Sequence, residues 1–328
     1  MSLLTLIQFW QYSWQLVNEL SSRQHMKKVI ADIEIGDKKI SSASEMADAF
    51  NCHFANIGHD LARDIPSADT DTVPESYLIP ANATFSFKSC SSNEVRKLLE
   101  KLDTKKSTGL DNLPSGMLNI AADVLAPSLT FLFNQSISSG FVPTEWKLAR
   151  VTPIFKKGKR QDVNNYRPIS IIPAVAKVFE RIIYDQFFKY LNDNDLLVNC
   201  QSGFRSLHST LTSLLEASNS WSVNIDNGLI NGVIFIDLKK AFDTIDHKTL
   251  LRKLASYGID HMALKWFDSY LSGRQQKCVV NGELSGARAV TCGVPQRSLI
   301  GPPLSIAASS LPELESALNT ELANLNIV

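Results

Sequence analysis

A run of four β-prone apolar residues, Val233 to Ile236, ends directly at an aspartate, Asp237. A continuous apolar run is typical of a strand buried on both faces, so it predicts a sheet that is covered by helices. A carboxylate at the exposed end of such a strand is held rigidly beside open space, which suits a metal ligand. The simpler alternative, which spacing alone favours, is that Asp237 only ends the strand and that Asp243 or Asp246 caps the next helix.

Helical patterns dominate the chain before that strand. Residues 1–64 are predicted to be helical, because apolar side chains recur at steps of three and four: Met46, Phe50, Phe54, Ile57 and Leu61. A connector rich in Pro, Ser and Asp follows. Ser91 and Glu94 then have the spacing of a capping box, which marks the start of another helix.

Four more helices are predicted, at residues 115–139, 173–191, 248–257 and 261–271. The first of them is expected to be interrupted at Pro127 and to end at Gly140. Two strands follow, 275–280 and 287–292, with Asn281 and Gly282 in the connection. This order predicts an α+β fold with helices on one face of a small sheet. The last residues carry leucine at helical spacing: Leu311, Leu314, Leu318, Leu322 and Leu325.

Composition narrows the class of protein but not its partner. Hydrophobic residues make up 44% of the 328, which excludes a disordered tail protein. The 33 basic and 33 acidic residues cancel, which argues mildly against a nucleic-acid partner. The segment from Trp146 to Ser170 nevertheless holds seven cations and one carboxylate, a local charge of +6. This run could be a solvated surface or a phosphate contact, and the sequence alone weighs the two evenly.

Cysteine usage and hydropathy predict an intracellular protein, nuclear or cytoplasmic. The five cysteines are widely spaced and form no CxxC pair, so neither a zinc ribbon nor a disulfide framework is expected. No stretch reaches the roughly 20 apolar residues that span a bilayer. The first 14 residues lack the basic start and cleavage site of a signal peptide.

Six motifs in a fixed order resemble the reverse transcriptases of non-LTR retrotransposons, particularly the jockey-like elements of animals. They are Lys106 to Asp111 (KSTGLD), Thr152 to Gly158 (TPIFKKG), Asn165 to Ser170 (NYRPIS), Gln201 to Arg205 (QSGFR, with His208, Ser209 and Thr210 after it), Phe235 to Asp243 (FIDLKKAFD) and Gly293 to Gln296 (GVPQ). Each motif is moderately specific, and the ordered set is very specific.

The resemblance implies a right-hand polymerase with fingers and palm. It divides the chain into a helical N-terminal extension and linker (1–84), an N-terminal fingers extension (85–145), fingers and an incomplete palm (146–306) and a residual C-terminal helix (307–328). In such a polymerase Asp237 would be the first catalytic aspartate. It would hold two Mg²⁺ ions with the carbonyl of Leu238, and the ions would stabilise both ends of an in-line displacement.

The resemblance also assigns the residues around the incoming nucleotide. Phe242 would be the aromatic gate that excludes a ribose 2′-OH, and Gln296 would line the nucleotide pocket. Arg167, Lys156 and Lys157 would neutralise the triphosphate or the template backbone. Phe204 and Arg205 match a motif that supports the template and the fold, and packing within the fingers is an equal alternative for them.

Three departures predict that the chain is catalytically inactive. The family places a Tyr- or Phe-Xaa-Asp-Asp hairpin soon after GVPQ, but this chain has no Asp-Asp pair and no aspartate after Asp268. An internal deletion between Ile306 and Ala307 would account for this. Arg297 stands where the family usually has glycine. The chain stops at Val328, so a thumb and an upstream endonuclease are expected to be absent.

The sequence therefore predicts a truncated RNA-directed DNA polymerase whose family partners are an RNA template, a DNA primer and deoxynucleoside triphosphates. Two Mg²⁺ ions need several carboxylates, and Asp237 alone supplies one. Two alternatives stay open: a non-catalytic remnant that binds nucleic acid through the surface from Lys156 to Arg167, and a gene-model artefact of an intact enzyme.

Overall fold

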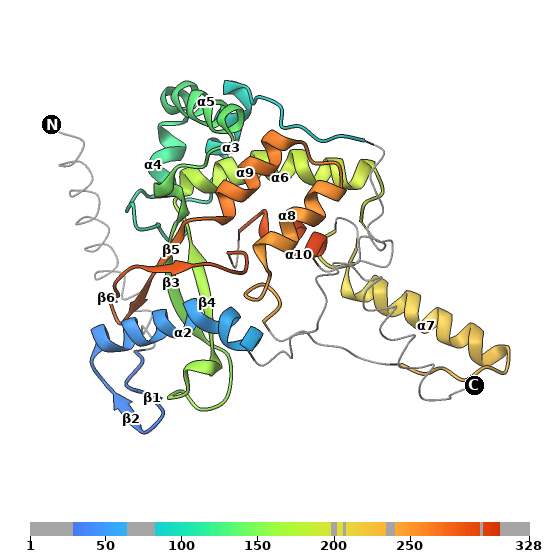
Figure 1. The fold of residues 1–328 in the computed structure, drawn as a ribbon, viewed down its shortest axis with the longest axis horizontal. Coiled ribbons are helices and arrows are strands. Elements are labelled where there is room, and N and C mark those ends of the chain that lie inside the picture. Colours follow the sequence, from blue (N-terminus) through green and yellow to red (C-terminus); the bar gives the residue numbers. More distant parts are fainter. Residues whose placement is uncertain are drawn as a thin grey trace.

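The computed structural model describes residues 29–63, 83–197, 202–205, 208–233, 240–295 and 298–308 (Figure 1). Its helices are α2 (Ala43–Arg63), α3 (Ser92–Glu100), α4 (Ser115–Ile120), α5 (Ala122–Ser139), α6 (Ala174–Asp193), α7 (Thr210–Asp226), α8 (His247–Ser256), α9 (His261–Leu271) and α10 (Gly301–Ala308), with short 3₁₀ turns η2 (Thr144–Lys147) and η3 (Val163–Asn165). Its strands are β1 (Ile33–Ile35), β2 (Lys38–Ile40), β3 (Leu148–Phe155), β4 (Tyr166–Ile171), β5 (Arg274–Val280), β6 (Glu283–Leu284) and β7 (Arg288–Val290). The mixture of helices and sheet confirms the predicted α+β class.

The larger sheet is mixed, with the strand order β4-β3-β5-β6 and with β7 also paired to β5. β3 runs antiparallel to β4 and parallel to β5. β5 pairs antiparallel with β7 near its start and with β6 near its end. Asn281 and Gly282 have φ angles of 51° and 98° between β5 and β6, as a two-residue hairpin turn requires. The strands predicted at 275–280 and 287–292 are thus confirmed as β5 and β7.

Helix α2 covers one face of this sheet. Its apolar side packs with strand residues in one buried cluster that includes Met46, Phe50, Phe54, Ile57, Val151, Tyr166 and Cys278. The fully buried Asn51 adds polar links, because its amide donates to the carbonyls of Gln276 at 3.3 Å and Gly286 at 2.8 Å. Its amide oxygen accepts from the Gln276 side chain at 3.0 Å. The apolar residues that recur at helical spacing in α2 therefore lie on the side of the helix that packs against the sheet.

Most of the other helices, but not α7, form a second core beside the sheet, where α3, α5, α6, α8 and α9 meet (Figure 1). Aromatic side chains fill it: the rings of Phe133 and Phe179 stack at 4.6 Å, and Trp266 is 1% exposed. The indole nitrogen of Trp266 donates to Ser136 Oγ at 3.1 Å, so this buried donor has its partner. The prediction of helices on one face of the sheet is thus correct mainly for α2, since most of the other helices build their own core.

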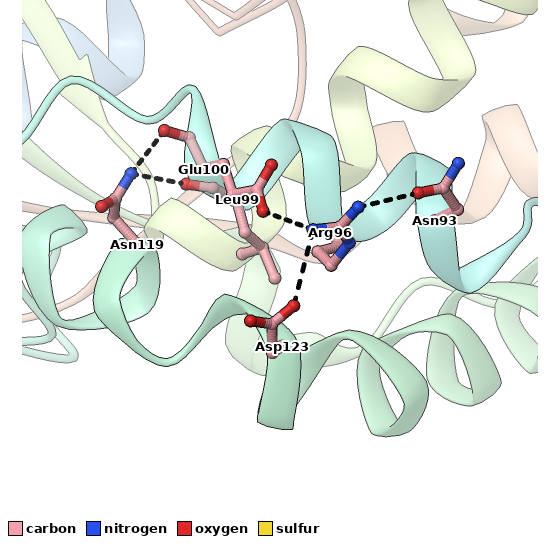
Figure 2. Close-up of polar contacts among 6 residues, drawn as sticks. All are labelled: Asn93, Arg96, Leu99, Glu100, Asn119 and Asp123. Carbon is pink, nitrogen blue, oxygen red and sulfur yellow. Dashed lines mark hydrogen bonds and ion pairs between the residues drawn. The ribbon is translucent and has the colours of Figure 1, made fainter.

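Polar contacts join α3 to α4 and α5 (Figure 2). The side-chain amide of Asn119 donates to the carbonyls of Leu99 at 3.3 Å and Glu100 at 2.5 Å. These two carbonyls lie at the C-terminal end of α3, where intrahelical partners run out. Arg96 pairs with Glu100 at 2.8 Å and with Asp123 at 3.6 Å. The predicted fingers extension, residues 85–145, is therefore linked across its own helices.

Two helix predictions are wrong in part. Residues 33–40 are not helical but form the antiparallel hairpin of β1 and β2, with Gly36 in the turn at φ 57°. Residues 1–28 lie outside the described part of the chain. The interruption predicted at Pro127 falls instead at Ala121, between α4 and α5. Pro127 continues α5 because it lies on the exposed side, where the carbonyl of Asp123, which loses its helical partner, can bond to water.

Most of the remaining local predictions are confirmed. Ser91 and Glu94 form a reciprocal capping box at the start of α3. Gly140 ends α5 in the left-handed conformation, at φ 65°. The predicted helices at 173–191, 248–257 and 261–271 are α6, α8 and α9. The predicted strand at 232–236 is untested over residues 234–236, which lie outside the described part, and Gly232 and Val233 are not in a strand. Among the described residues, no helix is both long and apolar enough to cross a membrane.

Candidate functional site

Two motif segments far apart in sequence meet at one place in the fold. The Gly293 amide donates to the Ile245 carbonyl at 2.8 Å, and the Val294 amide donates to the Phe242 carbonyl at 2.8 Å. The His247 Nε2–H donates to the Gly293 carbonyl at 2.7 Å. These bonds hold the predicted aromatic gate directly against the GVPQ segment.

Phe204 contacts the predicted gate. Its ring meets the Phe242 ring edge to face, with the centroids 6.1 Å apart. Phe204 is 60% exposed and has a φ of 61°, which is uncommon for a bulky residue. Of the two residues predicted to support template and fold, Phe204 therefore lies at the gate. Arg205 lies elsewhere, in a pocket that it and His208 line together with Tyr184 and Phe188 of α6.

The predicted phosphate-binding residues lie on the hairpin of β3 and β4. Lys156 and Lys157 follow β3, and Arg167 lies in β4, opposite Ile154. All three cations are exposed. The Lys156 amide donates to the Asn165 carbonyl at 2.8 Å, which extends the strand pairing to the base of the loop. The hairpin thus presents its charges from a backbone that is fixed at both ends.

The loop of this hairpin is ordered by its own side chains. Asp162 accepts from the Asn164 amide at 2.9 Å, and the Tyr166 hydroxyl donates to the Arg160 carbonyl at 2.7 Å. The Arg160 guanidinium lies 4.7 Å from the centre of the Phe155 ring, a cation–π contact that leaves the charge at the surface. A held loop of this kind presents cations to an anionic partner at a small entropy cost.

Strand alternation separates the cations of the sheet from α2. Tyr166 faces α2, so its neighbour Arg167 points to the opposite face. The same alternation puts Arg150 of β3 and Lys277 of β5, which are register partners, on that opposite face. Sequence reasoning missed Lys277, although the two-residue period of β5 would have placed it there.

Not every cation of the +6 segment is available to a partner. Lys147 is 7% exposed, and its ammonium donates to Ser269 Oγ at 3.3 Å. Burial and the nearby Arg274 charge lower the pKa of Lys147. Arg150 is half-buried, and its Nε has no hydrogen-bond partner among the described residues. The exposed cations of the segment are Lys156, Lys157, Lys159, Arg160 and Arg167.

A buried carboxylate holds the chain just beyond GVPQ. Glu180 of α6, 3% exposed, accepts from the Leu299 amide at 3.1 Å and from the Tyr270 hydroxyl at 2.6 Å. Burial raises the pKa of Glu180, although these hydrogen bonds and the Arg274 charge act in the opposite direction. Sequence analysis missed Glu180, because its position in α6 belongs to the inward, apolar side.

The residues predicted to do the chemistry lie outside the described part of the chain. This applies to Asp237 and Leu238, within 234–239. Gln296, predicted to line the nucleotide pocket, and Arg297, the departure from the family's glycine, also lie outside the described part. Within the described residues, no group of three or more His, Cys, Asp or Glu side chains could hold a metal ion. The described residues therefore do not by themselves assemble the ligands of the predicted Mg²⁺ ions.

Asp246 has the role that the simpler alternative in the sequence analysis gave it, a cap of the next helix. It caps α8, where its carboxylate accepts from the Thr249 amide at 2.7 Å. This bond keeps the pKa of Asp246 below its ordinary value, although burial acts to raise it. Asp243 lines a small pocket with Pro168, Ser170 and the Gly293–Pro295 segment. The pocket brings β4 of the basic hairpin next to the joined motif segments.

Comparison with known proteins supports the resemblance. Residues 154–312 match the family model described as reverse transcriptase (RNA-dependent DNA polymerase). Residues 154–312 of the chain therefore belong to the reverse transcriptase family. This region holds the basic hairpin, Phe204, Phe242 and the GVPQ segment.

Within that family the chain is similar to proteins of jockey-like non-LTR elements. It is 31% identical over 241 residues to the RNA-directed DNA polymerase from mobile element jockey of Drosophila melanogaster, covering 73% of this chain and 26% of that protein. It is 29% identical over 249 residues to the jockey protein of Drosophila funebris, covering 75% and 27%. It is 29% identical to the probable RNA-directed DNA polymerase from transposon X-element of Drosophila melanogaster, covering 64% and 23%. The chain spans about a quarter of the length of these relatives.

Proposed function

We propose that this chain is the fingers-and-palm portion of a retrotransposon RNA-directed DNA polymerase that binds an RNA template and DNA primer but does not extend the primer. The observation that carries the proposal is the hydrogen-bonded junction of the Phe242 and Gly293–Val294 segments. It lies beside a hairpin whose cations are exposed. The proposed division is a fingers extension at 85–145 and fingers with an incomplete palm at 146–306.

Binding is proposed to use the exposed cations of the β3–β4 hairpin. Five of them lie between Lys156 and Arg167, and the one carboxylate of that stretch, Asp162, is occupied by capping η3. A nucleic-acid backbone releases its condensed counterions when such side chains neutralise phosphates. The affinity should therefore be strongly salt-dependent and largely independent of sequence.

A salt series measured with the double variant Lys156→Ala/Lys157→Ala tests this binding. We expect weaker binding to a fluorescent single-stranded RNA, and a slope of log K against log salt that is less steep by about 1.4, since each phosphate contact contributes about 0.7. The matched control is Lys97→Ala/Lys101→Ala, two exposed lysines at α3. Equal losses in the two double variants would contradict the role of the hairpin.

That the chain does not extend a primer is proposed because the sequence lacks the family's Asp-Asp hairpin after GVPQ. Two-metal catalysis needs carboxylates on adjacent strands, and no Asp-Asp pair occurs in the 328 residues. Family nucleotide contacts would still be supplied by Phe242, Gln296 and the hairpin cations. The chain is thus expected to bind nucleotides without adding them to a primer.

Primer extension on an RNA template in Mg²⁺ tests the second half of the proposal. We expect no extended product from a protein preparation that binds the fluorescent RNA of the salt series. A Mg²⁺-dependent product that disappears in Asp237→Ala would show that the chain is an active polymerase. Genomic sequence provides an independent check, because a stretch coding for Asp-Asp between the codons for Ile306 and Ala307 would assign the missing hairpin to the gene model.

A further inference from the structure

Helix α7 extends away from the other described elements (Figure 1). Several of its apolar side chains are exposed. No residue of α7 is buried. At helical spacing one side carries Leu211, Leu214, Leu215, Ser218, Trp221, Ser222 and Ile225, which we name the α7 stripe. Its three leucines and Ile225 are 61 to 65% exposed. A contiguous apolar surface of this kind on a globular protein marks a contact surface.

The stripe has a matching partner in the chain itself. After α10, outside the described residues, leucine occurs at 311, 314, 318, 322 and 325, with intervals of three, four, four and three. The α7 stripe has members at 211, 214, 218, 222 and 225, with the same intervals. We propose that residues 311–325 form a helix that packs in parallel on the α7 stripe.

The side chains complement each other in this parallel register. Leu318 would stand opposite Ser218, and Leu322 opposite Ser222, so each large side chain of the C-terminal segment meets a small one on α7. A small side chain opposite a large one lets two helices approach closely, because the distance between helix axes depends on the side chains at the contact. At the two ends of the stripe, leucine or isoleucine of α7 would stand opposite a leucine of the C-terminal segment, as in the pair Ile225 and Leu325.

The C-terminal segment can reach α7, because both are anchored on α6. The Leu299 amide, just before α10, is bound by Glu180 of α6. Arg205 and His208, just before α7, line a pocket with α6 residues between Tyr184 and Asp193. These anchors are roughly 6 to 20 Å apart along α6, at about 1.5 Å per residue. α10 and three extended residues, at about 3.3 Å each, can cover that distance.

Tethering favours this segment over a second copy of the chain. A segment joined by a short linker meets its site at an effective concentration in the millimolar range. Both segments are acidic, with Glu216 and Asp226 on α7 and Glu313, Glu315 and Glu321 after α10. Ionic attraction therefore does not hold the contact, and it should persist at high salt, because apolar burial is not weakened by screening.

Engineered cysteine pairs in the full chain test the packing. Ser218→Cys/Leu318→Cys should form an intrachain disulfide under mild oxidation in dilute protein and 1 M salt (about a 3 Å screening length). The control Glu216→Cys/Leu318→Cys, with its cysteine on the opposite side of α7, should give at least tenfold less. Peptide mapping separates the engineered disulfide from those of native cysteines. Equal yields, no 218–318 disulfide, or a disulfide between chains that increases with concentration would overturn the proposal.

Hydrogen exchange gives a second test that does not depend on cysteine chemistry. Leu318→Asp should increase exchange of the α7 amides at least tenfold, because it places a charge on the proposed contact. Asn319→Asp introduces the same charge one residue later, off the leucine spacing, and should leave α7 exchange unchanged. Equal exchange of α7 in the two variants would overturn the proposal.

Discussion

Gly293 has a φ of 76° at the junction of the two motif segments. An added Cβ would lie 2.7 Å from the Phe242 carbonyl oxygen and 2.8 Å from the Asp243 Cα, both of which are backbone atoms. Neither atom can move without breaking the bonds between the segments. The glycine of GVPQ is therefore required twice, for its backbone conformation and for close approach.

We expect Gly293→Ala to destabilise the chain by more than about 1 kcal/mol, measured as the urea midpoint at constant m-value. The control is Gly282→Ala, where φ is 98° but no atom lies within 4 Å of the added Cβ. Gly282→Ala should show the strain alone and a smaller loss. A larger loss in Gly282→Ala would show that the close approach at Gly293 is unimportant.

One histidine of helix α2, His53, lies in an environment that disfavours its protonated form. His53 has a buried Nε2 with no hydrogen-bond partner among the described residues. Burial, and then the Lys240 charge, lower the pKa of His53 to about 4, although Asp162 and Asp60 act in the opposite direction. The folded state therefore favours neutral His53, whereas the unfolded chain takes up a proton near the ordinary histidine pKa of about 6.5.

The chain should therefore lose stability as the pH falls from about 6.5 to about 4, because the unfolded state binds the proton first. His53→Gln removes the titrating ring, so its urea midpoint should fall less over this range. His261→Gln, at an exposed histidine of α9, should keep the full loss. If His53→Gln loses as much stability as the parent chain, the acid sensitivity does not come from α2.

At the scale of the whole molecule, Asn51 joins parts of the chain more than 200 residues apart. It makes three hydrogen bonds to Gln276 and Gly286 from a fully buried position. Asn51→Ala should destabilise the chain by about 2 to 4 kcal/mol, because buried partners lose their bonds. Asn56→Ala, on the exposed side of α2, should change stability by less than about 0.5 kcal/mol. Urea unfolding measures both, and equal effects would contradict this role of Asn51.

Sequence patterns predicted most local elements well but missed the β1–β2 hairpin and the position of the break before α5. The capping box at Ser91, the end of α5 at Gly140 and the Asn281–Gly282 turn depend on residues a few positions apart. The β1–β2 hairpin was missed, because each strand has three residues and offers no period to detect. The break at Ala121 was missed because Pro127 is the stronger local signal, although the fold places it on the solvent side.

The sequence proposed candidate site residues but gave no sign of the contacts that join them. The ordered motifs identified Phe242, the GVPQ segment and the hairpin cations, and the family match over residues 154–312 confirms that assignment of family. The contact of Phe204 with Phe242, the anchoring of Leu299 by Glu180 and the alignment of Lys277 with Arg150 each join separate segments. No local pattern encodes such pairs.

By itself, the sequence determined the elements with local signals, the family and the lack of an Asp-Asp pair, since all of these can be read from neighbouring residues. Only the tertiary structure decided which cations are exposed to solvent. Lys147 is buried and Arg150 is half-buried, whereas Lys156, Lys157 and Arg167 are exposed to solvent. The physical reason is that charge belongs to a residue, whereas exposure depends on what the rest of the chain packs against it.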